Sequence, residues 1–379
     1  MYGNIKFFPN LNSLRFFAAI LVLIHHGEVI REKNSFLSFV DWSFFQNGGS
    51  AVRFFFILSG FLITYLLLKE KVSTQKINIK SFYFKRVVRI WPLYFLLVAI
   101  GVIILPQLFQ ILHINYAFPY SVNETWWMFL LFVPSLVTFR YGSHLLEPLW
   151  SIGVEEWFYI IWAPLFKWFK TPLIFIYSII VSKIFLLFAI HINLIENETI
   201  VHLIKTYSFE SMAIGGLGAY FIFHTKLNLQ QVYSKYKTTN FLLITATFIY
   251  LFLNKNIAPF INEYIFTDLL FNQIVINILF LNIIIYCGVI LSKKHWLNNK
   301  WLNIGGEISY GIYMYHMLVI FICIHFLKNL LLPLNPYVSF ICFYAFVIGG
   351  TITISYLSKR IFEDFFIKYK NRFDKTIQK

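Results

Sequence analysis

The chain has 379 residues, of which 59% are hydrophobic, 21% are aromatic and only 13% are charged. Soluble domains usually carry about 25% charged residues, so this composition excludes an ordinary soluble protein and indicates a polytopic membrane protein. The formal net charge of +15 would suggest a nucleic-acid partner in a soluble protein, but in a membrane protein its placement along the chain decides its meaning.

Ten apolar runs approach the length of about 20 residues that a helix needs to cross a bilayer. They cover residues 12–30, 50–68, 90–106, 149–167, 172–190, 200–223, 240–254, 268–291, 308–328 and 337–357. A further run at 124–139 is short, contains Pro134 and opens with a tryptophan pair typical of the membrane interface. We expect an interfacial or re-entrant helix there.

Basic residues support ten spans. With a cytoplasmic N-terminus, 24 of the 32 Lys and Arg residues fall on the cytoplasmic side, as the positive-inside rule requires. We therefore expect an all-α bundle of about ten transmembrane helices with both termini cytoplasmic. The expected organisation is one membrane domain over 1–358 and a basic cytoplasmic tail over 359–379, with no role in binding nucleic acid. No cleavable signal follows the first run, which we expect to stay as an anchor.

The first span, at Leu14–Val29, carries an arginine and two histidines. Arg15 and His26 are 11 residues apart, which places them about three helical turns apart, roughly 16 Å, and within about 20° of one face. His25 points about 80° away from that line. Ionisable groups within a span mark a site by default. The alternative is that Arg15 reaches the cytoplasmic interface and the histidines line a helix contact.

Two further arginine positions stand out in the next spans. Arg86 and Arg89 lie three residues apart at the cytoplasmic end of the third span. Two guanidinium groups on one helix face suit a phosphate group, although contact with anionic lipid would explain them equally well. Arg53 enters the second span about one turn from its outer side and could pair with Glu155. The neighbouring Ser59–Gly60 pair favours close helix packing.

Polar residues also mark the outer end of the fourth span. Ser151 and Glu155 are four residues apart on one face, with Trp150 preceding the serine and Glu156 pointing elsewhere. The carboxylate could orient a histidine, hold its charge or accept hydrogen bonds from sugar hydroxyls. An interfacial carboxylate in water is the alternative.

Near the C-terminus, Ser309, Tyr313 and His316 share one helix face. Packing and substrate contact are both open there. Lys205 and Glu210 are candidates for a structural pair. Neither a metal-binding HExxH or CxxC pattern nor a phosphate-binding glycine loop occurs in the sequence, so no metal site is predicted.

Five sequence blocks, taken together and in order, resemble the bacterial acyltransferase family 3, integral membrane enzymes that O-acylate cell-surface glycans. The blocks are LRFFAAILVLIHHG, VRFFFILSGFLITYLL, FKRVVRIWPLYF, PLWSIGVEEWFYIIW and ISYGIYMYHMLVI. The resemblance covers the chain from about Leu11 to Leu357. It implies a ten-helix bundle in the bacterial inner membrane that moves an acyl group, usually acetyl, from cytoplasmic acyl-CoA to an acceptor hydroxyl.

The resemblance also implies residue roles. The family's arginine and histidine match Arg15 and His26, its paired arginines match Arg86 and Arg89, and its serine-to-glutamate motif matches Ser151 and Glu155. Arg53 departs from the pattern, because the family commonly has an acidic residue there. Many members carry a fused extracytoplasmic hydrolase-like domain, and this chain resembles the stand-alone members.

The sequence thus predicts an acyltransferase with acyl-CoA as co-substrate and no permanently bound cofactor. His26 would act as general base or acyl carrier and Glu155 would orient it. The donor would bind to Arg15, Arg86 and Arg89, and the glycan acceptor to Trp150, Ser151, Arg53, Tyr313 and His316. Membrane lipids surround the bundle. The alternatives are a transporter or flippase of a glycan or lipid-linked precursor, and a family enzyme that acts on a lipid or small molecule.

Overall fold

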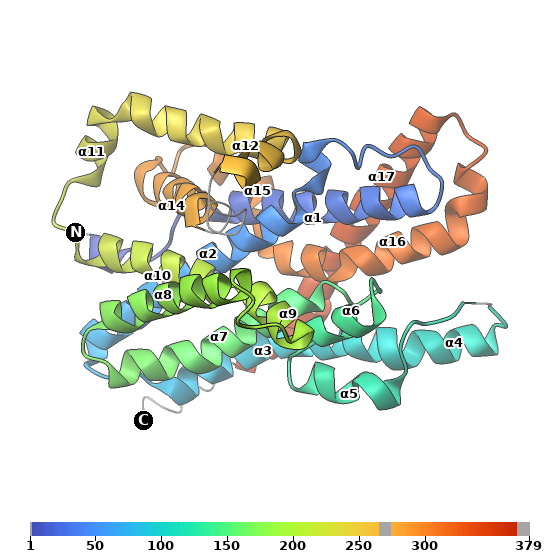
Figure 1. Cartoon of the computed structure of the whole chain (residues 1–379), viewed down its shortest axis with the longest axis horizontal. Coiled ribbons are helices and arrows are strands. Elements are labelled where there is room, and N and C mark those ends of the chain that lie inside the picture. The colour runs from blue at the N-terminus through green and yellow to red at the C-terminus, as the bar shows by residue number, and fades with distance from the viewer. Residues whose placement is uncertain (1, 115, 265–273, 370–379) are drawn as a thin grey trace. The chain divides into compact units, whose positions relative to one another are not determined.

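The computed structural model describes residues 2–114, 116–264 and 274–369, with side chains for all of these except 254–264. Every regular element in these ranges is helical (Figure 1), which confirms the all-α fold. The chain forms two compact units, each built from segments far apart in sequence. The first contains Met1–Ile77, Leu165–Ile195 and Ser208–Ser309, and the second contains Asn78–Pro164, Glu196–Tyr207 and Tyr310–Lys379.

Unit 1 is built on helices α2 and α10. Its main elements are α1 (Leu11–Lys33), η2 (Ser43–Gln46), α2 (Gly48–Thr74), α8 (Pro172–His191), α10 (Phe209–His224), α11 (Leu229–Lys235), α12 (Lys237–Tyr264), α14 (Ile276–Ile285), η5 (Tyr286–Ile290) and α15 (Lys300–Glu307). A Cβ on Gly60 would lie 2.0 Å from the carbonyl oxygen of Met212, and one on Gly215 would lie 2.0 Å from that of Ile57. Glycine is therefore required for α2 and α10 to approach this closely, as expected for the Ser59–Gly60 pair.

Unit 2 is built on α3, α7, α16 and α17. Its elements are α3 (Ile79–Ala99), the π-helical turn η3 (Ile100–Ile104), α4 (Leu105–Ile111), α5 (Val122–Leu130), α6 (Ser135–Tyr141), α7 (Leu149–Trp168, whose last turn belongs to unit 1), α9 (Glu198–Thr206), α16 (Ser309–Leu331), α17 (Pro336–Ser358) and the π-helical turn η7 (Lys359–Glu363). The Tyr94 hydroxyl donates to the Phe129 carbonyl at 3.0 Å and joins α3 to α5. On α16, Gly311 lets the helix approach Ser355 of α17.

Six described helices are long and apolar enough to cross a membrane, so the chain is a multi-pass membrane protein. They are Leu11–Lys33, Gly48–Thr74, Ile79–Ile111, Pro172–His191, Ser309–Leu331 and Pro336–Tyr369. The number rises to seven if α11 and the described part of α12, which meet at 82°, form one span. The count of ten spans and the cytoplasmic termini stay predictions. Residues 268–273 of one expected span lie outside the described residues.

The expected span at 200–223 is wrong as a single helix. It breaks between Thr206 and Phe209 into α9 and α10, which belong to different units. Each half is held by its own partner: His202 on α9 lies 3.1 Å from the Ser135 carbonyl of α6, whereas α10 is tied to α2 and α8. An apolar run cannot report this break, because long-range contacts cause it.

The expected non-spanning helix at 124–139 is two short helices, α5 and α6, of 9 and 7 residues. Neither is long enough to cross a bilayer. At the C-terminus, helix continues from Pro336 to Tyr369 without a break at 358. Residues 370–379 of the expected tail lie outside the described residues, and the division at 358 stays a prediction.

Candidate functional site

The two histidines occupy the C-terminal half of α1 in unit 1. His26 Nδ1 lies 3.1 Å from the Val22 carbonyl oxygen. A carbonyl only accepts, so Nδ1 carries the hydrogen and the lone pair of the neutral ring is on Nε2. His25 Nδ1 donates in the same way to the Phe45 carbonyl at 2.9 Å, and a Cβ on Gly48 would lie 2.3 Å from its ring. The ring of His25, fixed between η2 and the start of α2, meets that of His26 edge to face.

A buried ion pair fixes the segment that follows the histidines. Glu28 and Arg31 lie 3.5 Å apart, and both side chains are 0% exposed. Glu28 accepts from the Ser38 hydroxyl at 3.0 Å and from the backbone N–H of Phe39, while Arg31 donates to the Leu37 carbonyl. Arg31 lies just beyond the expected first span at 12–30, and the structure places it in the core.

Arg15 lies on the same continuous helix as the histidines, so the separation of about three turns is confirmed. Its side chain is half-buried. Around it α1 packs tightly on α15, because Cβ atoms on Gly305 and Gly306 would lie 2.6 Å from Phe16 and 2.3 Å from the Asn12 carbonyl oxygen.

The two arginines of α3 in unit 2 have different surroundings. The half-buried Arg86 packs its guanidinium carbon 5.6 Å from the Phe82 ring centroid and 5.8 Å from that of Tyr159. Its Nε is buried and has no hydrogen-bond partner among the described residues. Arg89 is exposed. Only one of the two guanidinium groups is therefore open to a ligand in this conformation.

Both glutamates of α7 face this arginine region. Glu155 accepts a hydrogen bond of 2.8 Å from Tyr159, and Glu156, 6% exposed, accepts one of 2.9 Å from Trp91 Nε1. Both lie within electrostatic range of Arg86. The structure thus brings Glu155 and Arg86, expected at opposite ends of their spans, within electrostatic range of each other, and the membrane side of each stays a prediction. Oε1 of Glu156 is buried without a hydrogen-bond partner in the part of the chain that is described.

Ser151 and Tyr313, expected in the acceptor site, meet in unit 2. Their hydroxyl oxygens are 2.8 Å apart, and both reach the Pro148 carbonyl, at 3.2 and 3.1 Å. Each hydroxyl has one hydrogen. Either hydroxyl can therefore donate to the carbonyl while it accepts a hydrogen bond from the other hydroxyl. His316 is 0% exposed, and its Nδ1 donates to the Tyr313 carbonyl at 2.6 Å. Trp150, which precedes Ser151 in the sequence, is half-buried.

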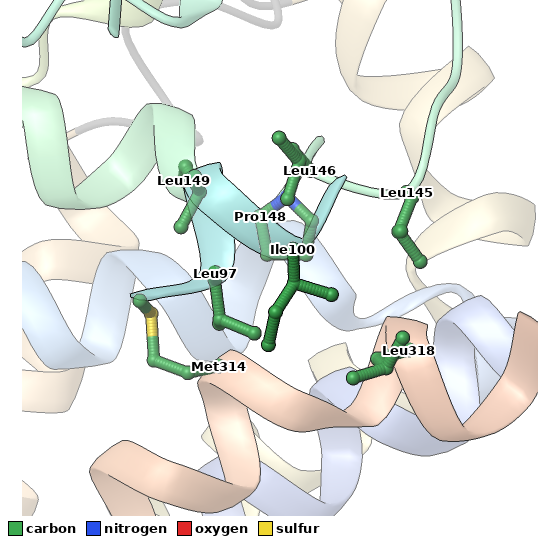
Figure 2. A pocket seen from close by; sticks show the side chains of 8 residues that line it. All are labelled: Leu97, Ile100, Leu145, Leu146, Pro148, Leu149, Met314 and Leu318. Atoms are coloured by element: carbon green, nitrogen blue, oxygen red, sulfur yellow. The ribbon is translucent and has the colours of Figure 1, made fainter. Parts of the chain in front are cut away.

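An apolar pocket adjoins Pro148 (Figure 2). Its lining comes from α3, η3, α16, the segment that precedes α7 and the first residue of α7, and comprises Leu97, Ile100, Leu145, Leu146, Pro148, Leu149, Met314 and Leu318. Every lining side chain is apolar, so the pocket suits an alkyl group rather than a charged one.

Another buried polar cluster lies in unit 1. Lys183 of α8 and Glu210 of α10 are 3.5 Å apart, with side chains 7% and 3% exposed. Ser211 donates to Glu210 and accepts from Asn277, and Arg53 of α2 acts electrostatically on Lys183. The structure therefore gives Glu210 a partner other than the expected Lys205. The partnership of Arg53 with Glu155 stays a prediction.

His144, between α6 and α7, is a structural histidine. It accepts from the Leu146 N–H at 3.1 Å through Nδ1, and its Nε2 lies 3.2 Å from the Thr138 hydroxyl oxygen. Burial lowers the pKa of His144 to about 4, although the nearby Glu147 acts in the opposite direction. With both ring nitrogens in hydrogen bonds, this histidine is neutral at physiological pH.

The residues around Arg86 and Arg89, here called the arginine cluster, include Glu156 and Trp91. Sequence reasoning missed both. The only signal was the position of Glu156 next to Glu155 in the same span. Among the described residues, no group of three or more His, Cys, Asp or Glu side chains could hold a metal ion.

Comparison with known proteins now identifies the class. A family model described as an acyltransferase domain, Acyl_transf_3, matches residues 8–360. The chain therefore belongs to this family, in agreement with the helices that are long and apolar enough to cross a membrane.

Its relatives include "Peptidoglycan O-acetyltransferase OatA" of Listeria monocytogenes, 29% identical over 44% of this chain and 26% of the relative. "Putative peptidoglycan O-acetyltransferase YrhL" of Bacillus subtilis is 26% identical over 83% of this chain and 49% of its own length. An O-acetyltransferase described as putative in Staphylococcus aureus is 30% identical over 42% of this chain and 24% of the relative. The chain thus spans half or less of the relatives it matches. No solved structure matches it.

Proposed function

We propose that this protein transfers an acetyl group from acetyl-CoA to a hydroxyl of a cell-envelope glycan, within the bacterial inner membrane. The family supports acyl transfer, and the names of the relatives support acetyl as the group and a glycan such as peptidoglycan as the acceptor. The observation that carries the proposal is the His26 tautomer. The hydrogen bond from Nδ1 to Val22 leaves a lone pair on Nε2, which is what a general base requires.

In the proposed reaction, His26 Nε2 takes the proton of the acceptor hydroxyl as its oxygen attacks the thioester carbonyl carbon. A C–O bond forms, the C–S bond breaks, and the departing CoA sulfur takes up a proton. In the second route, Nε2 itself attacks the thioester and carries the acyl group to the acceptor. Glu155 orients the histidine or balances its charge.

The donor's phosphates bind Arg89, Arg86 and Arg15 in this proposal. The exposure of Arg89 supports a first contact with a large anionic ligand, and the planar guanidinium group matches phosphate oxygens. Ser151, Tyr313, Trp150, His316 and Arg53 would contact the acceptor. The two hydroxyls that share the Pro148 carbonyl can exchange donor and acceptor roles, a property suited to binding a sugar hydroxyl.

The test is His26→Ala in a deletion strain that expresses the variant. General base assistance contributes about 100- to 10,000-fold in rate, so alkali-labile acetyl esters in the envelope should fall to the level of the deletion strain. His224→Ala is the matched control, because His224 makes the same bond one turn back along its helix, to Tyr220 at 3.0 Å, but is exposed. Wild-type ester levels in inserted His26→Ala would refute the proposal. Loss of surface polymer rather than its esters would favour a flippase.

A further inference from the structure

The C-terminal helical stretch, Pro336–Tyr369, carries a buried carboxylate six residues before its end. Glu363 is the last residue of η7, the π-helical turn that follows α17, and is 6% exposed. A π turn holds one more residue than an α turn and so changes the direction of the side chains that follow it, and such turns occur frequently at functional sites. η7 packs on α3, the helix of the two arginines. Glu363 therefore faces the arginine cluster rather than forming part of a solvated tail.

One oxygen of Glu363 has a defined partner and the other does not. The carboxylate is hydrogen-bonded to the Ser358 side chain, which in turn accepts from the Tyr315 hydroxyl at 3.0 Å. Oε1 is buried and lacks a hydrogen-bond partner within the described residues. A buried carboxylate oxygen without a donor is costly to keep and calls for an explanation.

The charges around Glu363 supply that explanation. Arg89 and Lys359 are the cations within its electrostatic range, and Asp364 is the neighbouring anion. Lys359 is already paired with Asp364, which leaves Arg89 as the cation available to Glu363. Tyr310 lies in the same field and is held by its hydrogen bond to the Ile90 carbonyl at 2.9 Å.

We propose that Glu363 is a positioning residue that orients the exposed guanidinium group of Arg89 toward the anionic end of acyl-CoA. This inference rests on the proposed function. An arginine on the surface of a helix loses much rotamer freedom when it binds a phosphate, and a fixed carboxylate that restricts it beforehand reduces that loss. Glu363 acts on donor affinity, not on the acyl-transfer step.

The experiment is a double-mutant cycle on the purified full chain, with CoA release measured against acetyl-CoA concentration while peptidoglycan is supplied at a fixed concentration as the acceptor. Glu363→Gln should raise the KM for acetyl-CoA about fivefold, the change that about 1 kcal/mol represents, and leave kcat unchanged. Arg89→Gln should raise KM as well. The double variant should match Arg89→Gln, because Glu363 acts through Arg89. Glu124→Gln, which removes an exposed carboxylate of α5 in the same unit, is the control and should change KM little.

The outcomes separate the two proposals. No CoA release by the wild type would overturn the proposed function and this inference with it. Two outcomes overturn the inference alone. In the first, Arg89→Gln raises the KM for acetyl-CoA but Glu363→Gln does not. In the second, the effects of the two substitutions on this KM add in the double variant. A lower KM in Glu363→Gln would mean that the carboxylate repels the donor. Thermal unfolding of each variant reports its fold, and Glu363→Asp, which keeps the charge, should retain part of the effect if Glu363→Gln is unstable.

Discussion

Two carboxylates of this protein, Glu28 in unit 1 and Glu156 in unit 2, are both buried, at 0% and 6% exposed, but differ in how their oxygens are satisfied. Glu28 pairs with Arg31 and accepts two further hydrogen bonds from the segment after α1. Glu156 accepts one bond, from Trp91, and its other oxygen has no hydrogen-bond partner among the described residues. The difference suggests that Glu28 holds the fold, whereas Glu156 is kept for a ligand or for the reaction.

The strongest test of this comparison is Glu28→Gln. It leaves the guanidinium group of Arg31 buried without its counterion, which typically costs about 3–5 kcal/mol. We expect a large drop in thermal stability in detergent. Glu32→Gln, on the exposed face of the same helix, should change stability by less than about 0.5 kcal/mol. Equal stability of the two variants would contradict a structural role for Glu28.

Lys183→Met extends the test to the pair of α8 and α10. It leaves Glu210 charged and buried, and because this pair is slightly more exposed than Glu28–Arg31, we expect a loss near the low end of the same range, about 3 kcal/mol. The double variant Lys183→Met/Glu210→Met should regain most of it, since neither member of the pair is then left charged without the other. A double variant as unstable as the single one would show that the pair is not the cause.

His144 shows that satisfied polar groups also occur in unit 2. Its pKa of about 4 in the folded state lies below the ordinary value of about 6.5, so the unfolded chain takes up the proton first as the pH falls. Its contribution to stability is full above about pH 6.5 and is lost down to about pH 4, by up to about 3 kcal/mol. In His144→Gln, unfolding measured from pH 7 to pH 4 should show a shallower pH dependence. An unchanged slope would exclude this histidine.

Glu156→Gln should have the smallest effect on stability. It tests whether Glu156, unlike Glu28, is dispensable for the fold. Glutamine keeps an oxygen that accepts from Trp91 and removes a buried charge, so we expect the stability to change by less than about 1 kcal/mol. Acyl transfer should fall despite the intact fold. A stability loss as large as that of Glu28→Gln would remove the distinction between the two carboxylates.

The sequence predicted what depends on local spacing. Helical register placed Arg15 and His26 on one continuous helix, and the Ser59–Gly60 pair indicated the close contact of α2 with α10. Ser151 and Tyr313 were each selected from the spacing on their own helix, whereas the contact between them, 162 positions apart, was not predicted. Such predictions succeed because an apolar run of sufficient length forms a helix in lipid whatever its neighbours are.

What depends on long-range pairing could not be predicted. Glu363 looked like part of a basic tail, although a π turn aims it at α3. Glu156 was dismissed by its direction relative to Ser151, whereas its partner Trp91 lies 65 positions earlier in the sequence.

The interleaving of the two units has a consequence for biogenesis. Helix α1 (Leu11–Lys33) is synthesised long before its close neighbour α15, which begins at Lys300, so the tight packing of Gly306 on Asn12 can form only after all the intervening helices have been synthesised. Until then, α1 must stay in the translocon or in lipid without the packing that α15 provides. Mutations that slow this late assembly should lower the yield of inserted protein even where the finished enzyme would be stable.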